Sequence, residues 1–129
     1  MTRAKINSMW PFFIVSNVEQ SMAFYEEKLG FATEYRQPEV NPFAAIVRRD
    51  GAMLFLKSGT AAPLPNPKRD PDMRWDAYCS VPDPDALAAE FAERSVRFSV
   101  PLKDTTDGLR GFEIADPDGY VIFFGRTRS

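Results

Sequence analysis

Few side chains in this sequence could do chemistry, because its 129 residues include no histidine and only one cysteine, Cys79. Histidine is the commonest metal ligand and the commonest general base, so its absence argues against both kinds of site. Two carboxylates, Asp76 and Glu113, lie in segments rich in apolar and aromatic residues. They could pair with a positive charge on a ligand, or act as an acid–base pair with Tyr78 as hydrogen-bond donor. If they face open water, they are simply solvated.

Aromatic side chains near these carboxylates could bind a flat ligand, because ring faces stack on planar groups and attract cations by about 0.5–2 kcal/mol. The competing interpretation is that aromatic residues on strands belong to the core. Trp10, near the chain start, could also pack at a dimer interface. The predicted ligand-binding residues are Trp10, Phe12, Phe55, Asp76, Tyr78, Glu113 and Phe123.

Two hairpin signals organise the elements that must position these residues. Asp118-Gly119 is followed by an apolar, aromatic run, and Asp50-Gly51 is followed by a similar one. Glycine favours the tight turn, and the run after it predicts a strand. Gly51 and Gly119 stand 68 positions apart. A turn and strand that recur at such an offset predict a duplicated unit.

Each hairpin ends a segment with the predicted order β-α-β-β-β. In the first segment, strands are expected at 10–16, 31–35, 43–47 and 53–57. In the second, they are expected at 75–81, 96–100, 109–115 and 120–126. Asn17 should cap the first helix, which Gly30 ends, and Asp83 followed by Pro84 should begin the second.

A proline-rich stretch from 58 to 73 separates the two segments. Proline stiffens a chain and removes strand donors, so this stretch predicts a linker, with a lid over the site as the alternative. We therefore expect one domain over residues 1–129. It would contain βαβββ units at about 8–58 and 74–127, joined by a linker at about 59–73.

Alternation along the strands assigns two faces to the predicted sheet. One face is uniformly apolar and suits packing beneath the helices; it includes Phe13, Leu54, Leu56, Phe112, Ile114, Ile122, Phe124 and Cys79. The other face mixes aromatic rings with polar groups, as a ligand cleft does. On this assignment Cys79 is a buried structural thiol rather than a nucleophile.

The bulk composition excludes several classes of function. Sixteen basic and eighteen acidic residues give a net charge of −2, without the basic excess that nucleic acid or anionic membrane surfaces require. No apolar run approaches the roughly 18 residues of a membrane span, and the N-terminus lacks a signal-peptide pattern. A single cysteine allows no internal disulfide, so a cytoplasmic location is expected.

The repeated βαβββ order, together with Val15-Ser16-Asn17, Leu29-Gly30-Phe31 and Asp116-Pro117-Asp118-Gly119-Tyr120, resembles the vicinal oxygen chelate superfamily. That superfamily includes glyoxalase I, extradiol dioxygenases, fosfomycin-modifying enzymes and bleomycin-resistance proteins. The resemblance covers essentially the whole chain. It implies an α+β fold in which two tandem βαβββ units form a cup-shaped mixed sheet with helices on the outer face, usually completed in a homodimer.

The metal-dependent members carry His, Gln or Glu at four positions inside the cup. Ungapped matching places these positions on Trp10, Phe55, Asp76 and Phe123, of which three are aromatic and cannot hold a divalent ion. The sequence is therefore most similar to the metal-free bleomycin-resistance members, and no metal or other cofactor is expected.

The resemblance implies that the protein sequesters a planar, amphipathic, cationic ligand in an aromatic groove, without making or breaking bonds. One alternative is a superfamily-type enzyme that acts without metal through Asp76 and Glu113. The other is a subunit with no ligand of its own, whose aromatic patch is a protein interface.

Overall fold

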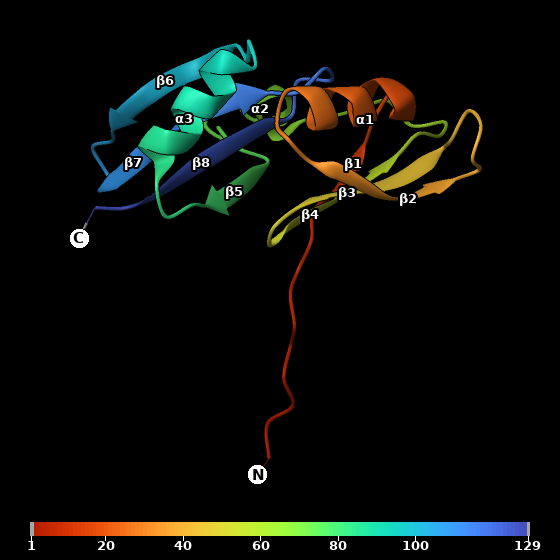
Figure 1. The fold of residues 1–129 in the computed structure, drawn as a ribbon, viewed down its shortest axis with the longest axis horizontal. Coiled ribbons are helices and arrows are strands. Elements are labelled where there is room, and N and C mark those ends of the chain that lie inside the picture. Colours follow the sequence, from red (N-terminus) through yellow and green to blue (C-terminus); the bar gives the residue numbers. More distant parts are fainter. Residues whose placement is uncertain (1, 129) are drawn as a thin grey trace.

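The computed structural model describes residues 2–128 and arranges them as two units that lie side by side (Figure 1). Unit 1 contains β1 (Phe12–Ile14), α1 (Val18–Glu27), β2 (Ala32–Gln37), β3 (Ala44–Arg49) and β4 (Ala52–Lys57). Unit 2 contains β5 (Ala77–Ser80), α3 (Pro84–Glu93), β6 (Phe98–Asp104), β7 (Leu109–Ala115) and β8 (Val121–Thr127). A one-turn helix, α2 (Asn66–Arg69), lies between them. The predicted α+β class and the repeated βαβββ order are confirmed.

The two units share one sheet topology. Strand order is β1-β4-β3-β2 in unit 1 and β5-β8-β7-β6 in unit 2, with a parallel pair at β1–β4 and at β5–β8. Within residues 2–128 no strand pair joins the two sheets. The expected mixed sheet is therefore built as two four-stranded sheets. Both long helices lie on the same side of the molecule, and each packs on the sheet of its own unit (Figure 1).

Local sequence explains where both long helices begin. The Asn17 side chain accepts a hydrogen bond from the backbone N–H of Gln20 at 2.9 Å, and the Asp83 side chain accepts one from Ala86 at 3.0 Å. Each satisfies a helix N–H group that has no partner within the helix. Both predicted caps are confirmed.

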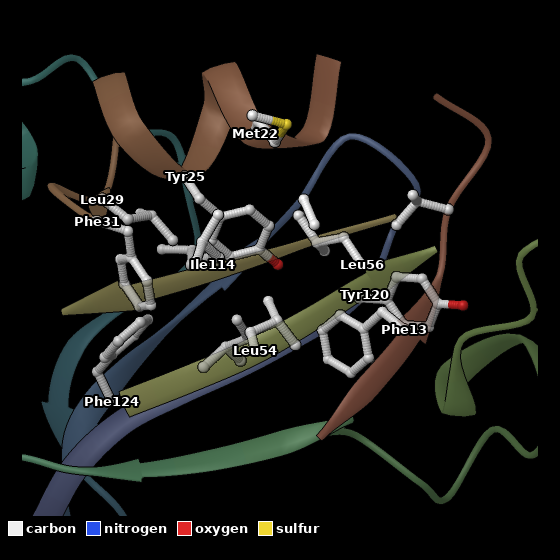
Figure 2. Packing of buried hydrophobic residues seen from close by; sticks show 14 of the residues in the cluster. Phe13, Met22, Tyr25, Leu29, Phe31, Leu54, Leu56, Ile114, Tyr120 and Phe124 are labelled. Carbon is white, nitrogen blue, oxygen red and sulfur yellow. The ribbon is translucent and has the colours of Figure 1, made fainter. Parts of the chain in front are cut away.

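The two units bury their helix-facing side chains in one continuous core (Figure 2). Phe13, Leu54 and Leu56 come from unit 1, and Ile114 and Phe124 come from unit 2. All five side chains are buried, as the alternation of their strands predicts. The strands therefore keep their second face free of the helices in both units.

The turn between β7 and β8 holds unit 2 against α1. The Tyr25 hydroxyl donates to Asp116 Oδ2 at 2.9 Å, while Asp116 Oδ1 accepts from the backbone N–H groups of Asp118 and Tyr120. Burial of the carboxyl raises the pKa of Asp116 to about 6, although the hydrogen bonds from Tyr25 and from the two backbone N–H groups act in the opposite direction. Burial also raises the pKa of Tyr25 well above its usual value.

The same turn contacts the end of β1. The Tyr120 ring stacks on Phe13 with centroids 4.2 Å apart, and its hydroxyl donates to the Ile14 carbonyl at 2.6 Å. The Ser16 hydroxyl donates to Asp118 at 2.6 Å. The Asp-Gly hairpin found in the sequence is thus both a turn and a contact between the units.

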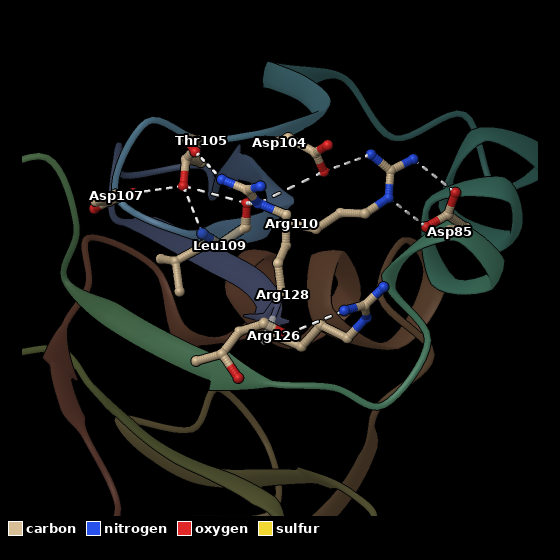
Figure 3. A network of polar contacts seen from close by, with 9 residues as sticks. Asp85, Asp104, Thr105, Asp107, Leu109, Arg110, Arg126 and Arg128 are labelled. Atoms are coloured by element: carbon tan, nitrogen blue, oxygen red, sulfur yellow. Dashed lines mark hydrogen bonds and ion pairs between the residues drawn. The ribbon is translucent and has the colours of Figure 1, made fainter.

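Within unit 2, an arginine network ties the start of α3 to the β6–β7 hairpin (Figure 3). Both oxygens of Asp85 accept hydrogen bonds from Arg110 at 2.8 Å, and Asp104 accepts one at 3.1 Å. The hydrogen bonds from Arg110 lower the pKa of Asp85 below its usual value. Because these side chains are largely exposed, the network orients the helix more than it stabilises the fold.

Several local features differ from the sequence-based expectation; for example, the strand expected at 96–100 is observed as Phe98–Asp104. The proline-rich linker contains the helical turn α2. At the first hairpin the positive φ falls on Asp50, at 52°, whereas at the second it falls on Gly119, at 90°. β1 spans only Phe12–Ile14, whereas a strand over 10–16 was expected. No helix among the described residues is long and apolar enough to cross a membrane.

Candidate functional site

The open side of the unit-1 sheet carries a row of large apolar side chains. Strand register aligns Phe12, Phe55, Ile46 and Tyr35 across the four strands. The Phe55 ring stacks on the Phe12 ring, with centroids 5.1 Å apart and an interplanar angle of 10°. The Trp10 ring packs against Phe55 with centroids 5.5 Å apart. The unit-1 face is defined by this cluster and its neighbour on β1: Trp10, Phe12, Ile14, Tyr35, Ile46 and Phe55.

Much of the unit-1 face remains open to solvent. Phe12 is 58% exposed and Trp10 is 38% exposed, although both belong to the ring stack. Lys57 lies beside Ile14 in the register, and Arg48 on β3 pairs with Glu34 at 3.4 Å. The arrangement offers a flat aromatic surface bordered by charge, which suits a planar ligand with both apolar and polar parts.

The equivalent row of unit 2 contains Tyr78, Phe123, Glu113 and Val100, aligned by the register of β5, β8, β7 and β6. Here the central ring is covered. Phe123 is only 2% exposed, because Trp75 stacks on it at 4.4 Å and Tyr78 lies at 5.4 Å. The unit-2 face is defined by Trp75, Tyr78, Val100, Glu113 and Phe123.

Two glycines allow the Phe123 ring to lie close against the sheet. A Cβ atom on Gly111 would stand 2.5 Å from Phe123 Cζ, and one on Gly125 would stand 2.4 Å from Phe123 Cε2. Real Cβ atoms do not approach other heavy atoms so closely. The facing pair of glycines is therefore what makes room for this ring.

Glu113 is buried at the centre of the unit-2 face, with 5% of its surface exposed. Its carboxylate accepts a hydrogen bond from Trp75 Nε1 at 2.9 Å and a charged one from Arg74 at 2.5 Å. A buried carboxylate without such donors would be strongly destabilising. Glu113 thus holds Trp75 over Phe123.

Asp76 is used to join backbone segments. Its Oδ1 accepts from the backbone N–H of Asn66, at the start of α2, at 2.6 Å. Its Oδ2 accepts from the backbone N–H of Val121, at the start of β8, at 2.8 Å. The side chain therefore anchors the linker on the sheet.

These residues do not fit a metal site of the kind that the superfamily's metal-dependent members use. At the four matched positions, Trp10, Phe55 and Phe123 provide ring carbons, and both oxygens of Asp76 already accept backbone hydrogen bonds. Within residues 2–128, no three Cys, Asp or Glu side chains are grouped closely enough to hold an ion. A divalent cation needs several oxygen, nitrogen or sulfur ligands.

The predicted site residues therefore separate into two groups. Trp10, Phe12 and Phe55 come together on the unit-1 face, and Tyr78, Glu113 and Phe123 come together on the unit-2 face. Asp76 lies beside the second group, bound to the linker.

Arg74 and Trp75 cover the unit-2 face, and neither was among the predicted site residues. One signal in the sequence could have revealed Trp75. It stands 65 positions after Trp10, close to the offset of the hairpins, and each tryptophan precedes the first strand of its unit.

The chain matches the family model described as the Glyoxalase/Bleomycin resistance protein/Dioxygenase superfamily over residues 7–124. Since this match spans nearly the whole chain and the topology agrees, the protein belongs to that superfamily. A comparison with curated protein sequences finds no match.

Several solved structures share the fold. TnmS3, an antibiotic-binding protein from Streptomyces sp. CB03234, is 26% identical with a TM-score of 0.70, and the match covers 97% of this chain and 99% of that one. A bleomycin-binding protein from Streptomyces verticillus, solved with copper(II)-bleomycin, is 24% identical with a TM-score of 0.72, covering 96% and 98%. TioX from Micromonospora sp. ML1 is 18% identical with a TM-score of 0.73, covering 94% and 99%.

Proposed function

We propose that this protein is a metal-free binding protein, which sequesters a planar, amphipathic small molecule against the unit-1 face. The observation that carries the proposal is the stack of Trp10, Phe55 and Phe12, whose rings remain partly exposed rather than packed in the core. Exposed and mutually stacked rings are a ready surface for a flat ligand. The similarity to an antibiotic-binding protein, TnmS3, supports the same class of function.

We further propose that the ligand carries a positive charge. The attraction would come from the ring faces of Trp10 and Phe55, because Asp76 and Glu113 already accept hydrogen bonds within the chain. Their engagement also weighs against the alternative of metal-free catalysis by these two carboxylates. A general base must be free to take a proton from the substrate.

We also propose that the protein is a homodimer and resides in the cytoplasm. Phe12, Ile14, Tyr35 and Phe43 are all exposed, and a second copy could cover the apolar surface that a ligand leaves open. A single thiol, Cys79, suits a reducing compartment. In this proposal residues 1–129 act as one domain, and the linker is structural rather than a lid.

The test is a thermal-unfolding screen with bleomycin and other planar cations, because a ligand that binds the folded state raises the melting temperature. Phe55→Ala should weaken binding of a positive compound by about tenfold, equivalent to about 1.4 kcal/mol. Phe43→Ala is the matched control, since Phe43 is also exposed but lies outside the ring stack.

Equal losses of affinity in both variants would contradict the assignment to the unit-1 face. Tightly bound stoichiometric metal in the purified protein would contradict the metal-free proposal. A monomeric mass in solution would contradict the homodimer.

A further inference from the structure

A groove of about 660 Å³ lies between the two units and is lined by residues of both sheets, among them Tyr78 of the unit-2 face. Phe13, Phe31 and Leu54 form its wall in unit 1, and Phe91 and Phe124 form its wall in unit 2. Its volume lies within the range of small-molecule sites, roughly 300–1,000 Å³. The groove is separate from the unit-1 face, because Phe13 and Leu54 point to the opposite side of their strands from Phe12 and Phe55.

The groove exists because neither sheet closes the space between the units. β1 pairs with β4 only from Phe55 to Lys57. The first half of β4 therefore has no strand beside it on the edge where β1 lies. Three of the side chains that line the groove are small, namely Ala52, Ala77 and Ala86. The gap therefore leaves room for a ligand between the units.

Arg49 and Glu90, two of the charged side chains that line the groove, pair with each other. Arg49 donates to both oxygens of Glu90, at 2.7 and 2.9 Å, and to the Leu29 carbonyl at 2.9 Å. The hydrogen bond from Arg49 lowers the pKa of Glu90, so the pair stays ionised near neutral pH. Asp83, at the rim, caps α3, and Asp50, which also lines the groove, is exposed to solvent on the first hairpin. A charged ligand would therefore find little to compensate for its lost water, whereas an uncharged aromatic one would lose little.

We propose that this inter-unit groove is a second small-molecule site, which takes an uncharged, largely aromatic ligand. Met53, Tyr78 and Leu87, which line the groove and are half-buried or exposed, would contact its rings, and the Ser80 hydroxyl at the rim could meet one polar group. The site differs from the proposed unit-1 site in its position and in the charge of its ligand.

Cys79 makes the proposal testable, because it is the only thiol and lines the groove. The probe is N-phenyl-1-naphthylamine, an uncharged fluorophore that brightens in apolar surroundings. Burial raises the pKa of the Cys79 thiol, so its modification by 5,5′-dithiobis(2-nitrobenzoate) is followed at pH 9. We expect saturable binding of one probe per chain. Probe at ten times its dissociation constant should slow the modification about tenfold.

Two substitutions on α3 locate the probe. Ala86 is exposed and lines the groove, so Ala86→Trp should fill it and abolish both the fluorescence and the protection of Cys79. Ala89 is also exposed on α3 but does not line the groove, so Ala89→Trp should leave both unchanged. Phe55→Ala should also leave them unchanged, which separates this site from the unit-1 face.

Binding that survives Ala86→Trp, or that Phe55→Ala removes, overturns the proposal. The proposal is also overturned if the unaltered chain shows no saturable binding of the probe or no protection of Cys79. This outcome does not depend on whether any variant folds. A dimer whose Cys79 is unreactive and which binds no probe would assign the groove to a second copy of the chain, and this also overturns it.

Discussion

The open faces of the two units share one arrangement of strands and central aromatic rings, but they differ in how far those rings are exposed to solvent. Phe55 and Phe123 occupy equivalent central positions, 68 residues apart, and each lies beside a tryptophan that precedes the first strand. Yet the Phe123 ring is buried, whereas Phe55 belongs to an exposed stack. The comparison shows how few side chains separate an open aromatic surface from a sealed one.

Three substitutions between the repeats explain the difference. Glu113 gives the Trp75 indole N–H an acceptor, whereas the equivalent row position in unit 1 is Ile46, which has none. Gly111 and Gly125 face each other beneath Phe123, whereas the equivalent register pair in unit 1 is Ala44 and Lys57. The hydrogen bond to the buried Glu113 carboxylate fixes Trp75 over Phe123. The missing Cβ atoms of the two glycines make space for the Phe123 ring.

The largest expected effect separates the two central rings. Phe123→Ala should lower the free energy of unfolding by about 3–5 kcal/mol, because it empties a fully packed site. Phe55→Ala should lower it by only about 1 kcal/mol, since much of that stack already contacts water. Urea unfolding of both variants measures the difference. Similar losses would show that the two faces are equally packed.

The glycines beneath Phe123 provide the next test. A Cβ on Gly111 would lie 2.3 Å from the Phe124 carbonyl oxygen, so Gly111→Ala should destabilise the protein by about 3 kcal/mol. Gly51→Ala is the matched control in unit 1, because nothing lies within 4 Å of its added Cβ. That variant should stay within about 1 kcal/mol of the unaltered chain. If chemical denaturation shows both substitutions to be neutral, the Phe123 ring does not need the glycines.

The hairpins of the two units also differ, since the second is docked on α1 and contains the buried Asp116. Its pKa of about 6 lies above the unfolded value of roughly 3.9, so the folded state binds more protons between them. Stability from this group is therefore fully present below pH 4 and is lost as pH rises through 6, by about 2–3 kcal/mol. Asp116→Asn should flatten that part of a stability–pH profile.

Other carboxyl groups act at lower pH and in the opposite direction. The pKa values of Asp85, Glu90 and Asp107 are lowered by hydrogen bonds from Arg110, Arg49 and Thr105, so their contributions are lost as pH falls below the usual carboxyl range. The Asp116 prediction has a clear contrary outcome. If Asp116→Asn leaves the slope of the stability–pH profile between pH 4 and 7 unchanged, folding does not raise the pKa of the Asp116 carboxyl.

The smallest expected effect concerns Trp75, which covers Phe123. Glu113→Gln removes the charge that Trp75 and Arg74 bind, and should lower the free energy of unfolding by about 1–2 kcal/mol. It should also shift the fluorescence of Trp75 to longer wavelength, because the loosened indole meets water. Trp10→Phe provides the background that isolates Trp75. An unchanged emission maximum would show that stacking on Phe123 alone holds the indole.

The amino-acid sequence by itself determined the units and their two faces. Asn17 and Asp83 set where the helices begin, the Asp-Gly pairs mark the hairpins, and alternation along β4 and β8 assigns each side chain to a face. These features depend on near neighbours in the chain, so spacing and residue type are enough to predict them.

Tertiary structure alone decided which aromatic face is open. Glu113 and Asp76 could be interpreted as ligand carboxylates until their partners were known, and those partners are held by the folded linker and by β8. Trp75 covers Phe123 because residues from β5, β7 and β8 meet there. Burial depends on such distant contacts, which residue spacing does not encode.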